Sequence, residues 1–240
     1  MQFFEYGKPD GIPLVLLMGT PQTGERVPEI VDIATEFGVR LICGVRSWYA
    51  DQDVKPSFEI CTAEVNGYLK ENGIDTACVL GGSGGGPFAL HLASNHADTF
   101  NTCYLLASMG DPEVFKRRVV SPHTHTLLDL FSNNDYGRAI AQLGEWGMPP
   151  PMAHGVWGDF QVLFGTWSTV SFTSSVRVYI HHAESDDNAP LESVQTLASK
   201  LTNCQLCISP HASHLAFASR EFAELRTIFS EVAESHAARQ

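Results

Sequence analysis

The sequence predicts an α/β fold in which a mostly parallel sheet carries helices on both faces. Short apolar stretches typical of buried strands alternate with longer stretches of helical periodicity over most of the 240 residues. The alternation stops between about residues 108 and 174 and then resumes. Alternating strands and helices are characteristic of parallel sheets covered on both sides, and the interruption indicates an inserted unit.

The first half of the chain predicts five strands and three helices. Strands at residues 3–6 and 14–17 are separated by the turn KPDGIP, which favours a hairpin or meander. The elements that follow are a helix at 28–37, a strand at 40–43, a helix at 58–70, a strand at 77–80, a helix at 87–95 and a strand at 103–107. After the interruption we expect a strand at 176–180, a helix at 191–201, a strand at 205–209 and a terminal helix at 220–237.

The interrupted stretch, residues 108–174, predicts a small, mainly helical cap. It contains several short helical patterns, a run of three prolines at 149–151 and three of the four tryptophans. Residues 1–107 and 175–240 would form the core, so we expect a single structural domain with a lid. The carboxyl edge of an open α/β sheet is where ligands bind, and we expect the cap to lie over that edge.

Composition excludes several classes of protein. Fifteen basic residues against 27 acidic ones give a net charge of -12, which argues against nucleic-acid partners and against docking on anionic membranes. The sequence has no apolar run of about 18–20 residues and no signal-peptide pattern. Cys43, Cys78 and Cys103 lie in strand-like runs, and Cys204-x-x-Cys207 lacks a second pair. We expect a cytoplasmic protein with reduced cysteines.

The segment ACVLGGSGGGPFAL carries the most informative motif. Gly81–Gly85 matches G-x-S-x-G between a predicted strand and a predicted helix, the context of a nucleophile elbow around Ser83. So tight a turn leaves no room for side chains two positions before and after the serine, which explains Gly81 and Gly85. A Walker loop would need a lysine, and a dinucleotide fingerprint would follow the first strand of its unit. Neither alternative fits this segment.

With this motif the sequence resembles the α/β-hydrolase fold superfamily, in the capped group whose elbow often reads G-x-S-G-G-G-P. Nearly the whole chain takes part in the resemblance. The similar segments are the oxyanion loop LVLLMGTPQTG, the strand and loop LICGVRSWYADQ, the acid-bearing segment YIHHAESDDNAP and the histidine loop PHASHLAF. The resemblance implies a cap inserted after strand 6 and a site that combines serine, acid and histidine.

The chain order serine, acid, histidine selects the other members of the site. Matching the acid segment to the family pattern places the acid at Asp186, with Asp187 and Glu184 as neighbours in a weaker register. A minority arrangement, with the acid after an earlier strand, would use Asp111. The family pattern selects His214 as the base, with His211 as a loop residue. Several other histidines could suggest a metal site, but they lack ligand spacing, so we expect no metal; they are His123, His125, His154, His181 and His182.

The resemblance also implies an oxyanion hole formed by the backbone amides of Thr20 and Gly84. Two departures from the family pattern affect this region. Met18 stands where the family usually has a histidine that props the oxyanion loop, and Val45 replaces the usual aspartate before Arg46. Large apolar side chains suggest a substrate pocket, with packing of the cap on the core as the equal alternative. The candidates are Met18, Trp48, Trp146, Trp157, Phe160 and Phe164.

These features predict a serine hydrolase that cleaves an ester, lactone or related acyl bond of a small, apolar molecule. No cofactor is expected, and the expected partners are a small-molecule substrate and at most a second copy of the chain, as monomer or homodimer. Acyl transfer, lyase chemistry and carbon–carbon bond cleavage use the same site and stay open. Aminopeptidase action would need cap acids to hold an amine; the candidates are Asp111, Glu113, Asp129, Asp135, Glu145 and Asp159. A binding protein without turnover is the remaining alternative.

Overall fold

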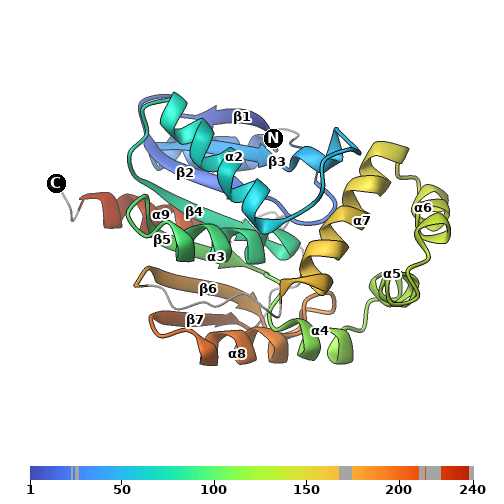
Figure 1. Ribbon diagram of the computed structural model, residues 1–240. Helices are drawn as coiled ribbons and strands as arrows, with labels where there is room; N and C mark the ends of the chain where they lie inside the picture. Colours follow the sequence, from blue (N-terminus) through green and yellow to red (C-terminus); the bar gives the residue numbers. More distant parts are fainter. Residues whose placement is uncertain (23, 25–26, 168–174, 211–213, 215–222, 238–240) are drawn as a thin grey trace.

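The computed structural model describes residues 1–22, 24, 27–167, 175–210, 214 and 223–237. Within these ranges, seven strands form one sheet in the order β1-β3-β2-β4-β5-β6-β7 (Figure 1). All neighbouring strands are parallel except β1 and β3. The strands are β1 Gln2–Gly7, β2 Ile12–Leu17, β3 Val39–Val45, β4 Ala77–Gly82, β5 Phe100–Leu106, β6 Arg177–Ala183 and β7 Cys204–Ser209. The predicted α/β class and mostly parallel sheet are confirmed.

The first two strands do not form the expected hairpin or meander. β1 pairs antiparallel with β3, whereas β2 lies between β3 and β4 and is parallel to both. Burial explains the difference. Residues Leu14–Leu17 of β2 are all buried, while every residue of β1 is half-buried or exposed. A strand that is buried on both faces belongs inside a parallel sheet, and a strand with one solvent-exposed face belongs at its edge.

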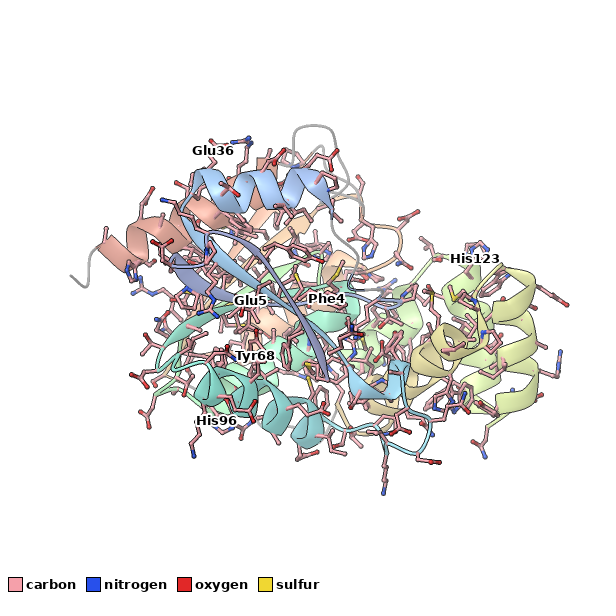
Figure 2. All side chains as sticks on the ribbon, turned by 90° about the horizontal axis from the view of Figure 1, so that it is seen from above. Phe4, Glu5, Glu36, Tyr68, His96 and His123 are labelled. Carbon is pink, nitrogen blue, oxygen red and sulfur yellow. The ribbon has the colours of Figure 1, made fainter. Side chains whose placement is uncertain are left out.

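Helices cover both faces of the sheet, and Figure 2 shows Glu36 on α1 and His96 just after α3 on opposite sides of it. Helices α1 (Pro28–Glu36) and α9 (Ala223–Ala237) pack on one face, and α2 (Phe58–Glu71), α3 (Gly86–Asn95) and α8 (Leu191–Lys200) pack on the other. Alternate strand residues serve the two cores, as the two-residue period of a strand requires. In β2, Leu14 and Leu16 face α1 and α9, and Val15 and Leu17 face the other side.

Four helices lie between β5 and β6 in the part of this stretch that the structure describes, and we call them the inserted helices. They are α4 Pro112–Arg118, α5 Pro122–Ser132, α6 Tyr136–Glu145 and α7 Pro150–Gly165. Asp111, Ser121 and Asp135 cap the first turns of α4, α5 and α6 by accepting hydrogen bonds from backbone amides. Helices α5, α6 and α7 stand beside one end of the sheet (Figure 1).

The insertion follows the fifth strand that the structure describes, so the expectation of strand 6 is wrong for this chain. The described residues before the insertion contain one antiparallel strand, β1, and four parallel strands, β2 to β5, which makes five strands and not six. Across the described ranges, no helix is both long and apolar enough to cross a membrane. The first residues of the predicted terminal helix, 220–222, lie outside the described residues.

All six cysteines are free thiols. Cys43, Cys78 and Cys103 are buried within β3, β4 and β5. Cys204 and Cys207 both lie on β7, where side chains three positions apart point to opposite faces of the strand. The Cys-x-x-Cys spacing therefore does not bring these two thiols together.

Candidate active site

Ser83 occupies the tight turn that joins β4 to α3. It opens η2 (Ser83–Gly85), a single 3₁₀ turn that leads directly into the helix. Its φ of 48° lies in the left-handed region, where residues with a side chain are strained. Such strain persists only where the surrounding structure leaves no alternative, and it is concentrated at functional sites. The half-buried Ser83 side chain borders the cavity described below.

Two glycines make this turn possible. A Cβ on Gly81 would lie 2.6 Å from the Cα of Gly86, and one on Gly85 would lie 2.0 Å from the Leu17 carbonyl oxygen. Both contacts involve backbone atoms, which cannot swing away as a side-chain end can. The sequence-based reason for glycine two positions before and after Ser83 is therefore confirmed.

Ser83, His214 and Asp186 form one chain of hydrogen bonds. Ser83 Oγ lies 3.1 Å from His214 Nε2, and His214 Nδ1 lies 2.9 Å from each carboxyl oxygen of Asp186. A carboxylate only accepts hydrogen bonds, so Nδ1 carries the imidazole proton. The lone pair of Nε2 then faces the Ser83 hydroxyl. The structure thus brings together the three residues selected from the sequence; His211 lies outside the described residues.

Asp186 is held from both sides of its loop. Its Oδ1 accepts hydrogen bonds from the backbone amides of Asn188 at 2.9 Å and Ala189 at 2.7 Å. Buried His182 donates from Nε2 to the Ala189 carbonyl at 2.7 Å, which ties β6 to the end of the same loop. Burial lowers the pKa of His182 below 6.5 despite the opposing effect of the Asp186 carboxylate. A neutral His182 therefore fixes the loop that presents the acid.

A cavity of about 530 Å³ lies between the carboxyl ends of the strands and the inserted helices. Ser83 and His214 are on its wall, together with Thr20 and Gly84, whose amides are the expected oxyanion hole. A Cβ on Gly84 would come within 2.6 Å of Thr20 Oγ1, so these two residues stand against each other beside Ser83. The cavity therefore gathers all the predicted elements of an acyl-transfer site except the buried acid.

The inserted helices supply most of the apolar wall of the cavity. Trp146, Phe160 and Phe164 line it, as expected. Met148, a further cap side chain expected at an apolar pocket, also lines it. The sequence reasoning missed other apolar lining residues, which are Met109, Phe115, Leu127, Val156 and Leu163. Helical periodicity is a signal that could have found two of them, because Val156, Phe160, Leu163 and Phe164 follow the spacing i, i+4, i+7, i+8 along α7. His123, which Figure 2 shows at the end of the molecule where the inserted helices lie, also lines the cavity.

Three of the expected pocket residues, Met18, Trp48 and Trp157, are not on the cavity wall, which corrects the prediction. Met18 continues the alternation of Leu14 and Leu16, so its side chain packs into the core beneath α1 and α9. Trp48 is fully buried and donates from Nε1 to Asp159 Oδ1 at 2.9 Å. Trp157 sits on the other side of α7 and packs against Phe131 of α5 and Tyr136 of α6.

A fully buried ion pair joins the inserted helices to the core, and the sequence reasoning missed it. Arg46 Nη2 lies 2.5 Å from Asp159 Oδ2, and neither side chain is exposed. Burial alone would lower the pKa of Arg46, but the charge and hydrogen bonds of Asp159, together with Tyr49 and Cys61, outweigh it and the net pKa is raised. Burial, together with the same carboxylate, raises the pKa of Tyr49 well above 10.0. The signal in the sequence was an aspartate inside the apolar run VWGDFQVLF, because such a charge needs a partner.

The acids proposed for an amine-binding site lie elsewhere. None of the six, all of which the structure describes, lines the cavity. Asp111 caps α4 and forms an ion pair with Lys200, and Asp135 caps α6. Asp159 forms an ion pair with Arg46. Among the described residues, no group of three or more His, Cys, Asp or Glu side chains is placed to hold a metal ion.

The architecture and this site define an α/β-hydrolase fold, and solved structures of that fold superpose on nearly the whole chain. The esterase RhEst1 from Rhodococcus sp. ECU1013 matches with a TM-score of 0.72 at 17% identity, covering 96% of this chain and 94% of that one. The enol-lactonase from Burkholderia xenovorans LB400 matches with a TM-score of 0.67 at 18% identity, covering 95% of each chain. The 2-hydroxy-6-oxo-6-phenylhexa-2,4-dienoate hydrolase from Rhodococcus sp. strain RHA1 gives 0.68 at 16% identity, covering 93% and 91%. Neither the family models nor the curated protein sequences give a match to this chain.

Proposed function

We propose that this protein is a serine hydrolase that cleaves an ester, lactone or related acyl bond of a small apolar molecule. One observation carries the proposal, namely the hydrogen-bonded chain that runs from Ser83 and His214, on the wall of a cavity of about 530 Å³, to the buried Asp186. A serine hydroxyl is a weak nucleophile that needs a base within reach and an acid behind the base. The distances here meet both needs.

In the proposed reaction, Ser83 Oγ attacks the acyl carbon while His214 Nε2 takes the hydroxyl proton. The Asp186 carboxylate holds Nδ1–H and stabilises the imidazolium that forms. The tetrahedral intermediate collapses as His214 returns the proton to the leaving alcohol oxygen, and the acyl group stays on Ser83. Water then attacks the acyl-enzyme with His214 as base, which releases the acid and restores Ser83.

The negative oxygen of the intermediate would lie against the amides of Gly84 and Thr20. Gly84 follows the nucleophile within η2, and α3 begins two residues later, so the positive end of the helix dipole faces the same spot. Removal of one such donor typically lowers the rate about 10²–10³-fold.

The cavity wall supports an uncharged, apolar substrate. As far as the structure describes it, the wall is mostly aliphatic and aromatic, with one carboxylate, Asp187, and no lysine or arginine. An acyl chain gains roughly 0.8 kcal/mol for each methylene that it buries in such a wall. A second carboxylate on the substrate would meet Asp187 without a fixed cation to balance it. The similar structures named as an esterase and an enol-lactonase are consistent with this substrate class.

The test is hydrolysis of 4-nitrophenyl esters from acetate to octanoate, with the charged hemisuccinate as a comparison. We expect kcat/KM to rise with chain length and to be lowest for the hemisuccinate. Ser83→Ala should lower kcat/KM at least about 10⁴-fold and abolish labelling by a fluorophosphonate. Ser199→Ala, at an exposed serine of α8, is the matched control and should behave as the wild type.

Folded wild-type protein that neither labels nor turns over any ester would contradict the proposal and favour a binding role. Labelling with release of 4-nitrophenol but slow release of acid would show that the acyl-enzyme awaits another acceptor. Adding short alcohols to the same assay then separates acyl transfer from hydrolysis.

A further inference from the structure

Asp159 of α7 is the acceptor for four side chains that come from two separate segments of the core. Arg46 donates to it twice, from Nε at 2.7 Å and from Nη2 at 2.5 Å. Thr20 Oγ1 and Tyr49 OH each donate to Oδ2 at 2.5 Å, and Trp48 Nε1 donates to Oδ1. The carboxylate is fully buried. Five hydrogen bonds fix its position.

The same arginine also holds the backbone of the loop after β2. Arg46 Nη1 donates to the Met18 carbonyl at 2.9 Å, and Nη2 donates to the Gly19 carbonyl at 3.1 Å. Together with the Thr20 hydroxyl on Asp159, these contacts fix three consecutive residues, 18 to 20, of the oxyanion loop. A Cβ on Gly19 would lie 2.9 Å from Ser83 Cβ, so a small shift of this loop changes the space around the nucleophile.

The oxyanion loop has no polar side chain of its own at position 18 to hold it. Met18 packs into the core, and Val45 gives Arg46 no local carboxylate. The carboxylate comes instead from α7, where Asp159 directly precedes Phe160 and lies one turn before Leu163, both on the cavity wall. The helix that shapes the cavity is thus also the helix that holds the loop.

We propose that Asp159 is a positioning residue, which through Arg46 and the Thr20 hydroxyl holds the Thr20 amide where the reaction's oxyanion forms. This inference rests on the proposed hydrolase function. It also assigns the hydroxyl of Thr20 a function distinct from that of its amide. A purely structural ion pair would affect folding, whereas a positioning pair also affects transition-state binding in protein that is fully folded.

The sharpest test is Thr20→Val, which removes the hydroxyl, keeps the side-chain shape and retains a backbone amide at position 20. Thr20→Ser, which keeps the hydroxyl, is the matched rescue. We expect Thr20→Val to lower kcat about 10- to 100-fold with KM changed less than about threefold, because a displacement near 1 Å can cost this much. Affinity for a trifluoromethyl ketone analogue should fall by the same factor as kcat. Thr20→Ser should stay within about threefold of the wild type in both.

Asp159→Asn tests the other end of the contact. We expect it to lower kcat and analogue affinity in parallel, and the double variant with Thr20→Val to lose less than the product of the two single effects. Val162→Ala, at a buried position of α7 away from the cavity wall, controls for loss of stability. All assays are run well below the urea or thermal midpoint of each variant.

Equal kcat and analogue affinity in Thr20→Val and Thr20→Ser would overturn the inference, even if both variants are destabilised. Absence of turnover in the wild type would instead contradict the proposed function, so the two failures are distinguishable.

Discussion

Asp186 differs from the acids beside it in how its carboxylate is buried and bonded. It accepts hydrogen bonds from two backbone amides and from the His214 imidazole, whereas Glu184 is exposed and Asp187 lies on the cavity wall. A buried carboxylate with these partners can fix one tautomer of the imidazole, which an exposed neighbour cannot. The register chosen from the sequence is therefore the one with a physical basis.

Replacement of Asp186 with asparagine should leave the fold in place and remove the proposed reaction. The asparagine amide can donate a hydrogen bond to His214 Nδ1, which favours the tautomer that carries its proton on Nε2. In that tautomer Nε2 cannot accept the Ser83 proton. We expect kcat for ester hydrolysis to fall about 10⁴-fold. Glu184→Gln, at the exposed acid of the same segment, should stay within about twofold. A loss confined to Glu184→Gln, or shared equally, would show that the acid was assigned wrongly.

The sequence predicted the residues that carry motifs and missed those whose partners are remote. Ser83, His214 and Asp186 each follow a strand in a short local pattern, and the structure brings them together. Arg46 and Asp159 are 113 positions apart, and no local pattern connects them. Trp48 and Trp157 were expected on the cavity because they are large and aromatic, but the side on which a tryptophan packs depends on neighbouring elements.

At the scale of elements, the turn from β4 into α3 depends on how closely it packs against β2. The carbonyl oxygens of Leu17 and Met18 lie where a side chain on Gly85 would begin. The turn at Ser83 and the chain at the end of β2 therefore touch through backbone atoms, with no side chain able to adjust between them.

Gly85→Ala should disrupt both elements at once. Its Cβ would meet two carbonyl oxygens at 2.0 and 2.4 Å, so we expect a loss of about 3 kcal/mol or more in the free energy of unfolding, together with loss of ester hydrolysis. Gly67→Ala in α2 is the control, because nothing lies within 4 Å of its Cβ and alanine is the better helix former. It should stabilise the protein by about 0.5–1 kcal/mol. Urea denaturation measures both, and an unchanged midpoint for Gly85→Ala would contradict the packing argument.

Element positions followed from the sequence more readily than element pairing. Hydrophobic periodicity located every predicted strand to within a few residues, because burial acts on each segment separately. The partner of β1 could not be read in the same way. Its choice of β3 over β2 depends on which strand is most buried in the finished sheet, and that is a property of all seven strands together.

For the whole molecule, buried histidines determine how stability depends on pH. Burial lowers the pKa of four described histidines below 6.5 in the folded state, and these are His91, His154, His181 and His182. The unfolded chain then binds more protons below that pH, so stability is lost as pH falls from about 7 to about 5. Each proton taken up on unfolding contributes about 1.4 kcal/mol per pH unit. Glu5 and Asp111, whose pKa values are lowered from 4.5 and 3.8, act only in more acidic solution.

Urea denaturation at pH 7.5, 6.5 and 5.5 should therefore give a falling free energy of unfolding. His91→Gln removes one of these titrations and should flatten the slope. This variant separates the histidine effect from the relief of repulsion in a chain of net charge -12, which acts in the opposite direction. A free energy that rises from pH 7.5 to 5.5 in the wild type, with the same slope in His91→Gln, would refute this account.

The remote partnership of Arg46 and Asp159 also limits how this chain can be recombined with others of its fold. A crossover between residues 46 and 159 that replaced the inserted helices alone would bury a guanidinium without its carboxylate. Such a loss typically costs about 3–5 kcal/mol, a large share of the roughly 5–15 kcal/mol that holds a domain together. Viable chimeras would have to inherit Thr20, Arg46, Trp48, Tyr49 and Asp159 as a set, so the insertion is not an independently exchangeable module.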